Sequence, residues 1–312
     1  MISNIIEIEL PIDETLKIQR NRITPDTLTG SEKRICIVTG THGDEVEGQF
    51  VCYELIRRIN ENIEKLNGIV DIYPALNPMG IDSVSRSIPQ FDLDMNRIFP
   101  GNMNNSIPEL IASKIVDDIT GADFCLDIHS SNIFLREIPQ VRMSEDNAES
   151  LLPYAKMMGV DFIWVNATAS VLQSTLAHSL NTIGVPTLVI EMGAGMRITT
   201  QYGMDTVDGI FNLMKNLGIW TGDVNPVKTP IVSTDGEVGF VHAEVPGVFI
   251  PSINHWTNIR EGEHIGDIVN PLTGEIAQHL ESPCDGMVFT LREYPVVYEG
   301  SVISRVLGGK SE

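Results

Sequence analysis

Between residues 34 and 220, short apolar runs alternate with longer segments whose apolar residues recur every three or four positions. Uninterrupted apolar runs are typical of strands buried on both faces, and the three-to-four spacing is typical of amphipathic helices. We expect strands at 34–39, 69–74, 124–129, 162–165 and 187–192, and helices through 50–59, 108–119, 170–183 and 204–217. This alternation predicts an α/β fold with a mixed, largely parallel sheet covered by helices on both faces.

The pattern changes after residue 222, where short alternating stretches with many Gly and Pro residues replace the helical spacing. Stretches at 247–251, 275–280 and 286–290 predict a small all-β domain. Segments 260–266 and 282–288 resemble the half-repeats of barrel-sandwich domains. We therefore expect two domains, a catalytic α/β domain over 1–222 and a C-terminal β domain over 223–312.

Composition narrows the range of partners. The chain has 312 residues, of which 42% are hydrophobic, and its formal net charge is −21. So acidic a chain repels phosphate backbones, which argues against nucleic-acid binding and against anionic membranes. No apolar stretch approaches the roughly 18 residues of a membrane span, and no signal peptide is visible, so we expect a cytoplasmic protein. The four cysteines are far apart in the chain, which predicts free thiols in a reducing compartment.

The strongest chemical signal is His42-Gly43-Asp44-Glu45, directly after the first expected strand of the α/β region. His42 and Glu45 can face one metal ion from a turn that enters a helix, and His129, at the end of another expected strand, can supply a third ligand. Two histidines and one glutamate leave a fourth position for water, as in catalytic zinc sites. Asp127, two residues before His129, is placed to orient that histidine. Taken singly, each residue is also explained as a hydrogen-bonded loop or turn residue.

A second signal lies in the long connection 77–101, which contains Arg86, Asn96 and Arg97. The planar guanidinium group of Arg suits carboxylates, so these residues could hold a substrate carboxylate and polarise a carbonyl. Surface ion pairs of Asp92 and Asp94 with the two arginines would explain the same composition.

The third signal is Glu191, which ends an apolar strand beside the Gly-rich turn 193–195. A carboxylate in this position is well placed to be a general base with a raised pKa. A glutamate that bridges the turn or caps a helix is the alternative on local grounds.

Taken together, THGDEVEG, NP…R…DLDMNRIFPG, DIHSS and EMGAG resemble the aspartoacylase/succinylglutamate desuccinylase family of the zinc carboxypeptidase superfamily. The resemblance covers roughly residues 35–196 and the trailing β domain. It implies a zinc-carboxypeptidase-like fold in which His42, Glu45 and His129 are the ligands of one Zn²⁺. It also implies that Arg86 polarises the substrate carbonyl and that Glu191 is the general base and acid. Asn96 and Arg97 correspond to the pair that binds the substrate carboxylate.

The resemblance implies a zinc-dependent amidohydrolase that removes an acyl group from a small N-acylated amino acid or related amine. The acyl group, the contribution of Tyr294 or Tyr298 and the possibility of a homo-oligomer stay open. Three alternatives remain: a carboxypeptidase acting on short peptides, an Fe(II) oxygenase with two histidines and one carboxylate, and a non-catalytic binding protein built on a hydrolase fold.

Overall fold

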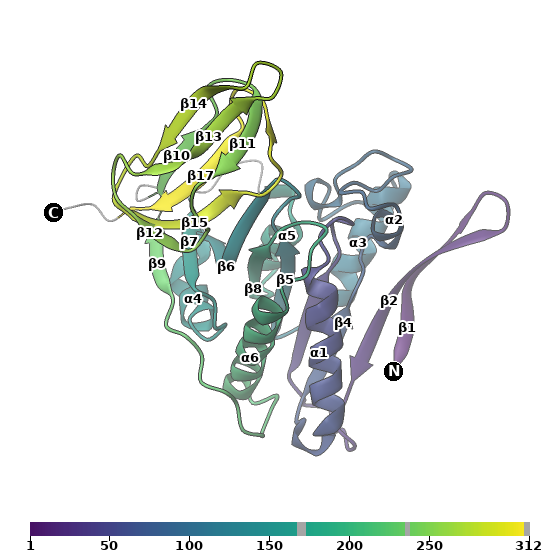
Figure 1. The fold of residues 1–312 in the computed structure, drawn as a ribbon. Coiled ribbons are helices and arrows are strands. Elements are labelled where there is room, and N and C mark those ends of the chain that lie inside the picture. The colour runs from purple at the N-terminus through teal and green to yellow at the C-terminus, as the bar shows by residue number, and fades with distance from the viewer. Residues whose placement is uncertain (167–172, 235–237, 309–312) are drawn as a thin grey trace.

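The computed structural model describes residues 1–166, 173–234 and 238–308 (Figure 1). The α-helices are α1 (Glu47–Glu61), α2 (Pro78–Ser83), α3 (Ile107–Ile119), α4 (Glu145–Ala155), α5 (Leu176–Thr182) and α6 (Thr200–Leu217), with short 3-10 helices η1 (Ile63–Lys65) and η2 (Met95–Arg97). The strands up to residue 234 are β1 (Ile2–Leu10), β2 (Glu14–Ile23), β3 (Arg34–Thr39), β4 (Ile69–Tyr73), β5 (Phe124–Ser130), β6 (Leu135–Ser144), β7 (Phe162–Asn166), β8 (Thr187–Gly193) and β9 (Ile231–Thr234). The remaining strands are β10 (Val238–His242), β11 (Gly247–Pro251), β12 (Thr257–Ile259), β13 (His264–Asn270), β14 (Glu275–Glu281), β15 (Gly286–Arg292), β16 (Val296–Val297) and β17 (Val302–Leu307).

A large mixed sheet organises the molecule, in the order β1-β2-β4-β3-β5-β8-β6-β15-β17-β10, with β7 and β9 extending from β6 and β12 pairing with β15. Strands β4, β3, β5 and β8 run parallel to one another, so their carboxyl ends meet at one edge. In open α/β sheets this edge is where ligands bind. The predicted α/β class with a mixed, helix-covered sheet is confirmed.

The central strands are apolar throughout because successive side chains enter two different cores. In β3, Ile35 and Ile37 join a core with α1, α4 and α6, whereas Cys36 and Val38 join a core with α3 and α5. Alternation of side chains across a strand delivers apolar groups to both faces at once. Figure 1 shows α1 and α6 packed side by side against the sheet.

The C-terminal region is all-β in its described residues, as expected. A second sheet, β14-β13-β11-β16, packs against β10, β15 and β17 around an apolar core that includes Phe249, Ile268 and Val306. The large sheet also reaches into this region, because β15 pairs with β6 and β9 pairs with β7.

Several elements differ from the sequence-based expectation. The β1–β2 hairpin, β6 and α4 were not predicted, and the connection 77–101 carries α2 and η2. Helix α5 begins at Leu176, later than expected, and the expected start at 170 lies outside the described residues. Helix α6 begins four residues before the predicted position, at Thr200.

All four cysteines are free. In the described ranges, none of the helices combines the length and apolar character needed to cross a bilayer.

Candidate active site and metal centre

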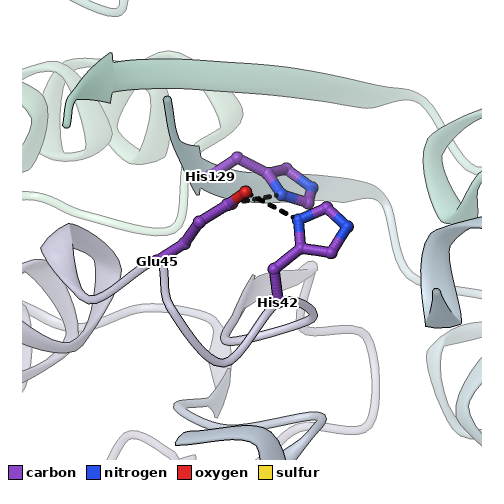
Figure 2. Close-up of side chains that lie close together, drawn as sticks. All are labelled: His42, Glu45 and His129. Atoms are coloured by element: carbon purple, nitrogen blue, oxygen red, sulfur yellow. Dashed lines mark hydrogen bonds and ion pairs between the residues drawn. The ribbon is translucent and has the colours of Figure 1, made fainter. Parts of the chain in front are cut away.

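His42, Glu45 and His129 meet at the carboxyl edge of the sheet, where the turn after β3 faces the end of β5 (Figure 2). Glu45 Oε1 lies 2.8 Å from His42 Nδ1, and Glu45 Oε2 lies 2.9 Å from His129 Nδ1. All three side chains are buried. The turn needs glycine at position 43, because a Cβ there would lie 1.9 Å from the carbonyl carbon of Gly80 in α2.

Each imidazole has a second carboxylate beside its other nitrogen. His42 Nε2 lies 3.1 Å from Asp94 Oδ1, and His129 Nε2 lies 3.1 Å from Asp127 Oδ1. Carboxylates in this position orient ligand histidines and leave the opposite nitrogen free to bind a metal. The position of Asp127 beside His129 agrees with the sequence-based interpretation, whereas the contact between Asp94 and His42 was not foreseen.

The electrostatics keep this cluster charged. Burial alone would lower the pKa of His129, but Asp127 and Glu45 outweigh it and raise that pKa well above its ordinary value. Burial would raise the pKa of Glu45, but the two imidazoles outweigh it and hold that pKa at about 2. A buried ionised carboxylate needs a positive partner, which the two protonated imidazoles supply and which a divalent cation could supply in their place.

The donor set fits a divalent metal ion. An imidazole nitrogen of His42, an imidazole nitrogen of His129 and a carboxylate oxygen of Glu45 all lie within 4.8 Å of one another. Two imidazoles with one carboxylate form a common catalytic zinc ligand set with an open fourth position. Both carboxylate oxygens of Asp127 are buried without a hydrogen bond, as is His129 Nε2. The 3.1 Å contact between His129 Nε2 and Asp127 Oδ1 therefore lacks the alignment of a hydrogen bond.

Arg86 lies directly against the cluster. Its Nη1 donates to Glu45 Oε1 at 3.0 Å, and its Nη2 donates to Asp94 Oδ2 at 3.2 Å. The ion pair of Arg86 with Asp94 considered from the sequence does form, but Asp94 also contacts His42, so the pair is part of the site. The guanidinium group is therefore within reach of a carbonyl bound beside the ligands.

Asn96 and Arg97 line the same cavity but differ in exposure. Asn96 is buried, and its Oδ1 accepts a hydrogen bond of 2.9 Å from the backbone N–H of Leu176, at the start of α5. Arg97 is exposed and donates to the carbonyl oxygen of Asn96 at 2.7 Å. The Arg97 side chain thus remains accessible to an anionic group of a ligand.

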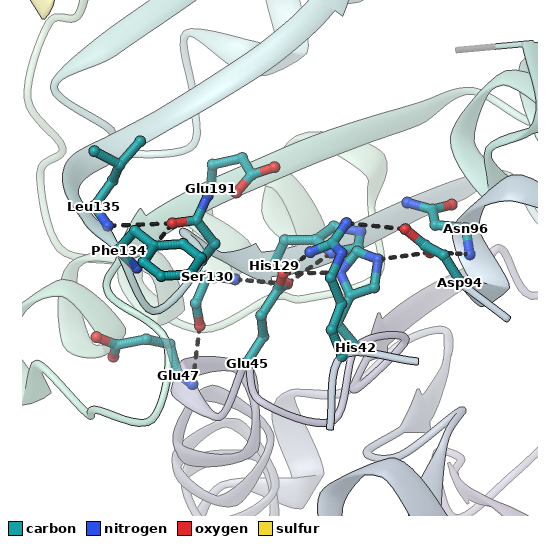
Figure 3. A network of polar contacts seen from close by, with 12 residues as sticks. His42, Glu45, Glu47, Asp94, Asn96, His129, Ser130, Phe134, Leu135 and Glu191 are labelled. Carbon is teal, nitrogen blue, oxygen red and sulfur yellow. Dashed lines mark hydrogen bonds and ion pairs between the residues drawn. The ribbon is translucent and has the colours of Figure 1, made fainter. Parts of the chain in front are cut away.

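Glu191 stands next to this network (Figure 3), because it occupies the position on β8 directly opposite His129 on β5. Directly opposed residues on neighbouring strands project to the same face. Burial raises the pKa of Glu191 to about 7, and the carboxylates of Glu45 and Glu137 act in the same direction against Arg142 and His129. A carboxylate that titrates near neutral pH can both accept and return a proton.

The cavity between these residues has a volume of about 690 Å³. Its far side contains a group that sequence reasoning missed: Glu137 and Arg142 on β6, Trp164 on β7 and Arg305 on β17. Arg142 donates to Glu137 at 2.7 Å and lies 3.6 Å from Glu191 Oε1, and Arg305 also pairs with Glu137. Both guanidinium groups lie over the Trp164 ring, at 5.3 and 5.5 Å from its centroid. No local motif marks these residues, because three different strands bring them together.

Tyr294 and Tyr298, the two tyrosines of the C-terminal region, are not among the residues that line the cavity. Tyr298 is exposed, and Tyr294 is half-exposed with its ring against Phe134, a cavity-lining residue, at 5.9 Å between centroids. Tyr294 therefore contacts a residue of the cavity wall.

The sequence is similar to that of a known enzyme family and to that of a named deacetylase. A family model of the succinylglutamate desuccinylase/aspartoacylase catalytic domain matches residues 31–217. The N-alpha-acetyl-L-2,4-diaminobutyric acid deacetylase of Halomonas elongata is 27% identical over 272 residues, which cover 82% of this chain and 76% of that protein.

The fold of this chain is similar to that of several solved structures. The product-bound ectoine utilization protein EutE of Ruegeria pomeroyi matches with a TM-score of 0.81 at 20% identity, over 95% of this chain and 90% of the other. A succinylglutamatedesuccinylase/aspartoacylase from Rhodobacter sphaeroides matches with a TM-score of 0.80 at 23% identity, over 96% and 92%. The matched range of the family model includes His42, Glu45, His129 and Glu191.

Proposed function

The chain belongs to the succinylglutamate desuccinylase/aspartoacylase family, and from this premise we propose that it is a zinc-dependent hydrolase of small N-acylated amino acids or acylated amines. The single observation that carries the proposal is the buried His42–Glu45–His129 cluster, which faces one cavity with Glu191 and Arg86. We propose that the reaction takes place in the cytoplasm.

In this proposal, His42, Glu45 and His129 would hold one Zn²⁺, which when bound would lower the pKa of a water molecule and polarise the amide carbonyl. Glu191 accepts the proton of the attacking water and passes it to the leaving amine. Arg86 donates hydrogen bonds to the oxyanion of the tetrahedral state, and Asp127 keeps His129 in its ligating orientation.

We assign substrate recognition to Asn96 and Arg97, which line the cavity. Arg97 offers an exposed guanidinium group to a substrate carboxylate, and one of its nitrogens also donates to the carbonyl oxygen of Asn96. The side chain of Asn96 connects the loop that carries Arg97 to the start of α5. The relative from Halomonas elongata is named for an acetylated amino acid. We therefore propose an N-acyl amino acid as the first substrate class to test, with acetyl as the first acyl group.

A hydrolysis panel followed by mass spectrometry tests this function. The zinc-loaded protein would receive N-acetyl, N-succinyl and N-formyl amino acids, acylated diamines and short peptides, each with and without a chelator. We expect an acyl amino acid or acylated diamine to be cleaved, with activity lost on chelation and restored by zinc. Cleavage of peptides alone would favour a carboxypeptidase, and oxygen uptake with bound iron would favour an oxygenase. No cleavage by zinc-loaded protein would contradict the proposal.

Asp127→Asn should weaken metal binding without removing a ligand. A partner of a ligand histidine typically contributes about 10–100-fold in metal affinity, and we expect a loss in this range, measured by competition with a chromophoric chelator. Asp123→Asn is the matched control, because Asp123 directly precedes the same strand, at the end remote from the ligands, and accepts a hydrogen bond from the backbone of Arg34. Equal zinc affinity in Asp127→Asn and the unmodified protein would contradict the role given to Asp127.

A further inference from the structure

A second group of two histidines and one carboxylate lies on the surface of the C-terminal region. It consists of His264 and Asp267 on β13 and His279 on β14. Asp267 Oδ1 lies 2.8 Å from His264 Nε2 and 2.7 Å from His279 Nδ1. Figure 1 shows β13 and β14 at the end of the C-terminal region that is remote from α1 and α6.

Strand geometry explains why the three side chains converge. Asp267 and His279 are direct partners in the antiparallel ladder, so they project to the same face. Residues three apart in a regular strand would point to opposite faces, but a register shift between His264 and Gly266 inserts one extra position. That shift returns His264 to the face of Asp267. Gly266 is required there, because a Cβ would lie 2.4 Å from the carbonyl oxygen of Ile250.

The charge of the cluster favours a cation. One oxygen of the Asp267 carboxylate lies within hydrogen-bond distance of both imidazoles, so an acidic group stands at the centre of the cluster. Glu281 stands opposite His264 in the ladder and adds a second acidic residue to this face. The protein as a whole carries a formal net charge of −21, which raises the local concentration of cations.

The donor set resembles that of the buried cluster. In each group a carboxylate contacts one nitrogen of each of two imidazoles, and one ligand atom per residue can be chosen so that all three lie within 4.8 Å. The side chains of His264 and His279 are 44% and 67% exposed, so water can complete the coordination of an ion. Imidazole ligands suit zinc, copper and nickel, whereas magnesium and calcium prefer sets made of oxygen atoms.

We propose that His264, Asp267 and His279 form a second binding site for a divalent transition-metal ion, of which zinc is the test case. The site is independent of the proposed active site and binds zinc more weakly, because its ligands are exposed and must be ordered on binding. Its ion lies in contact with solvent, where a donor group from another molecule can replace a water ligand.

Zinc titration of the intact chain, followed by native mass spectrometry and chelator competition, tests the site. We expect the unmodified protein to bind two ions, one tightly and one weakly, and the double variant His264→Gln/His279→Gln to lose only the weaker ion. His242→Gln is the matched control, because His242 is an exposed histidine of β10 outside the cluster, and it should keep both ions.

The outcomes separate this inference from the proposed hydrolase function. If the double variant binds as many zinc ions as the unmodified protein, with the same affinities, the surface site is refuted. If the unmodified protein binds a single ion that the double variant loses, the surface site stands and the buried centre fails. Circular dichroism of the double variant checks that the exposed replacements leave the fold intact.

Discussion

Glu191→Gln should retain bound zinc and lose nearly all turnover. Glutamine has almost the same size and can occupy the same position opposite His129, but it cannot accept a proton from water. General base catalysis contributes about 10²–10⁴-fold, so we expect kcat to fall by that factor. The measurement is a steady-state rate on the best substrate of the panel, with metal content determined on the same sample.

Glu293→Gln is the control for this result. Glu293 is an exposed carboxylate that is also paired with an arginine, Arg136 at 3.0 Å, but it lines a different cavity. Its replacement should leave kcat within a factor of about two or three, the ordinary scatter of effects at a site remote from the chemistry. Substantial turnover by Glu191→Gln would remove Glu191 from the proposed mechanism and leave the metal centre unaffected.

His129→Ala should lose both the metal ion and the activity. The substitution removes one of three proposed ligands and leaves Glu45 and Asp127 as buried carboxylates with one positive partner fewer. Because loss of a supporting carboxylate alone costs roughly 10–100-fold in metal affinity, loss of the ligand should cost more than that. The measurement is zinc content after dialysis, together with a thermal unfolding curve.

His178→Ala is the matched control for His129→Ala. His178 lies on α5 and lines the same cavity, but it is not part of the His42–Glu45–His129 cluster. It should therefore keep its zinc. If His129→Ala is too unstable to purify, His129→Gln retains a polar group at the position and tests the same ligand role. Full zinc occupancy in a folded His129 variant would refute the assignment.

The central part of the fold was predictable because its strands leave a strong local pattern. Residues 34–39 and 124–129 are largely apolar on both faces; the first run is followed by His42, and the second ends at His129. Since parallel strands end at the same edge, the proximity of His42 to His129 followed from their positions after β3 and at the end of β5. The same argument applies to Glu191 on β8, which lies directly opposite His129.

Elements with a mixed or interrupted pattern escaped prediction. Strand β6 contains Pro139 and mixes charged with apolar residues without a regular period, and α4 contains Pro153 in its interior. The cavity wall depends on this unpredicted strand, because Glu137 and Arg142 both lie on β6. Arg305 comes from 163 residues farther along the chain than Arg142, and no local spacing connects the two.

The contact between Glu137 and Arg305 has a consequence for exchanging parts between related proteins. Arg305 lies on β17, and Glu137 lies on β6, which pairs with β15. The α/β region and the C-terminal region therefore both contribute side chains to the wall of the cavity. A chimera that receives its C-terminal region from a relative would keep Glu137 of this chain. In place of Arg305 it would carry the residue that the relative has at that position. Truncating one partner of a buried charge pair is costly, because the remaining charge stays buried without compensation. The two positions must therefore be transplanted together, because otherwise the ion pair is lost from the cavity wall.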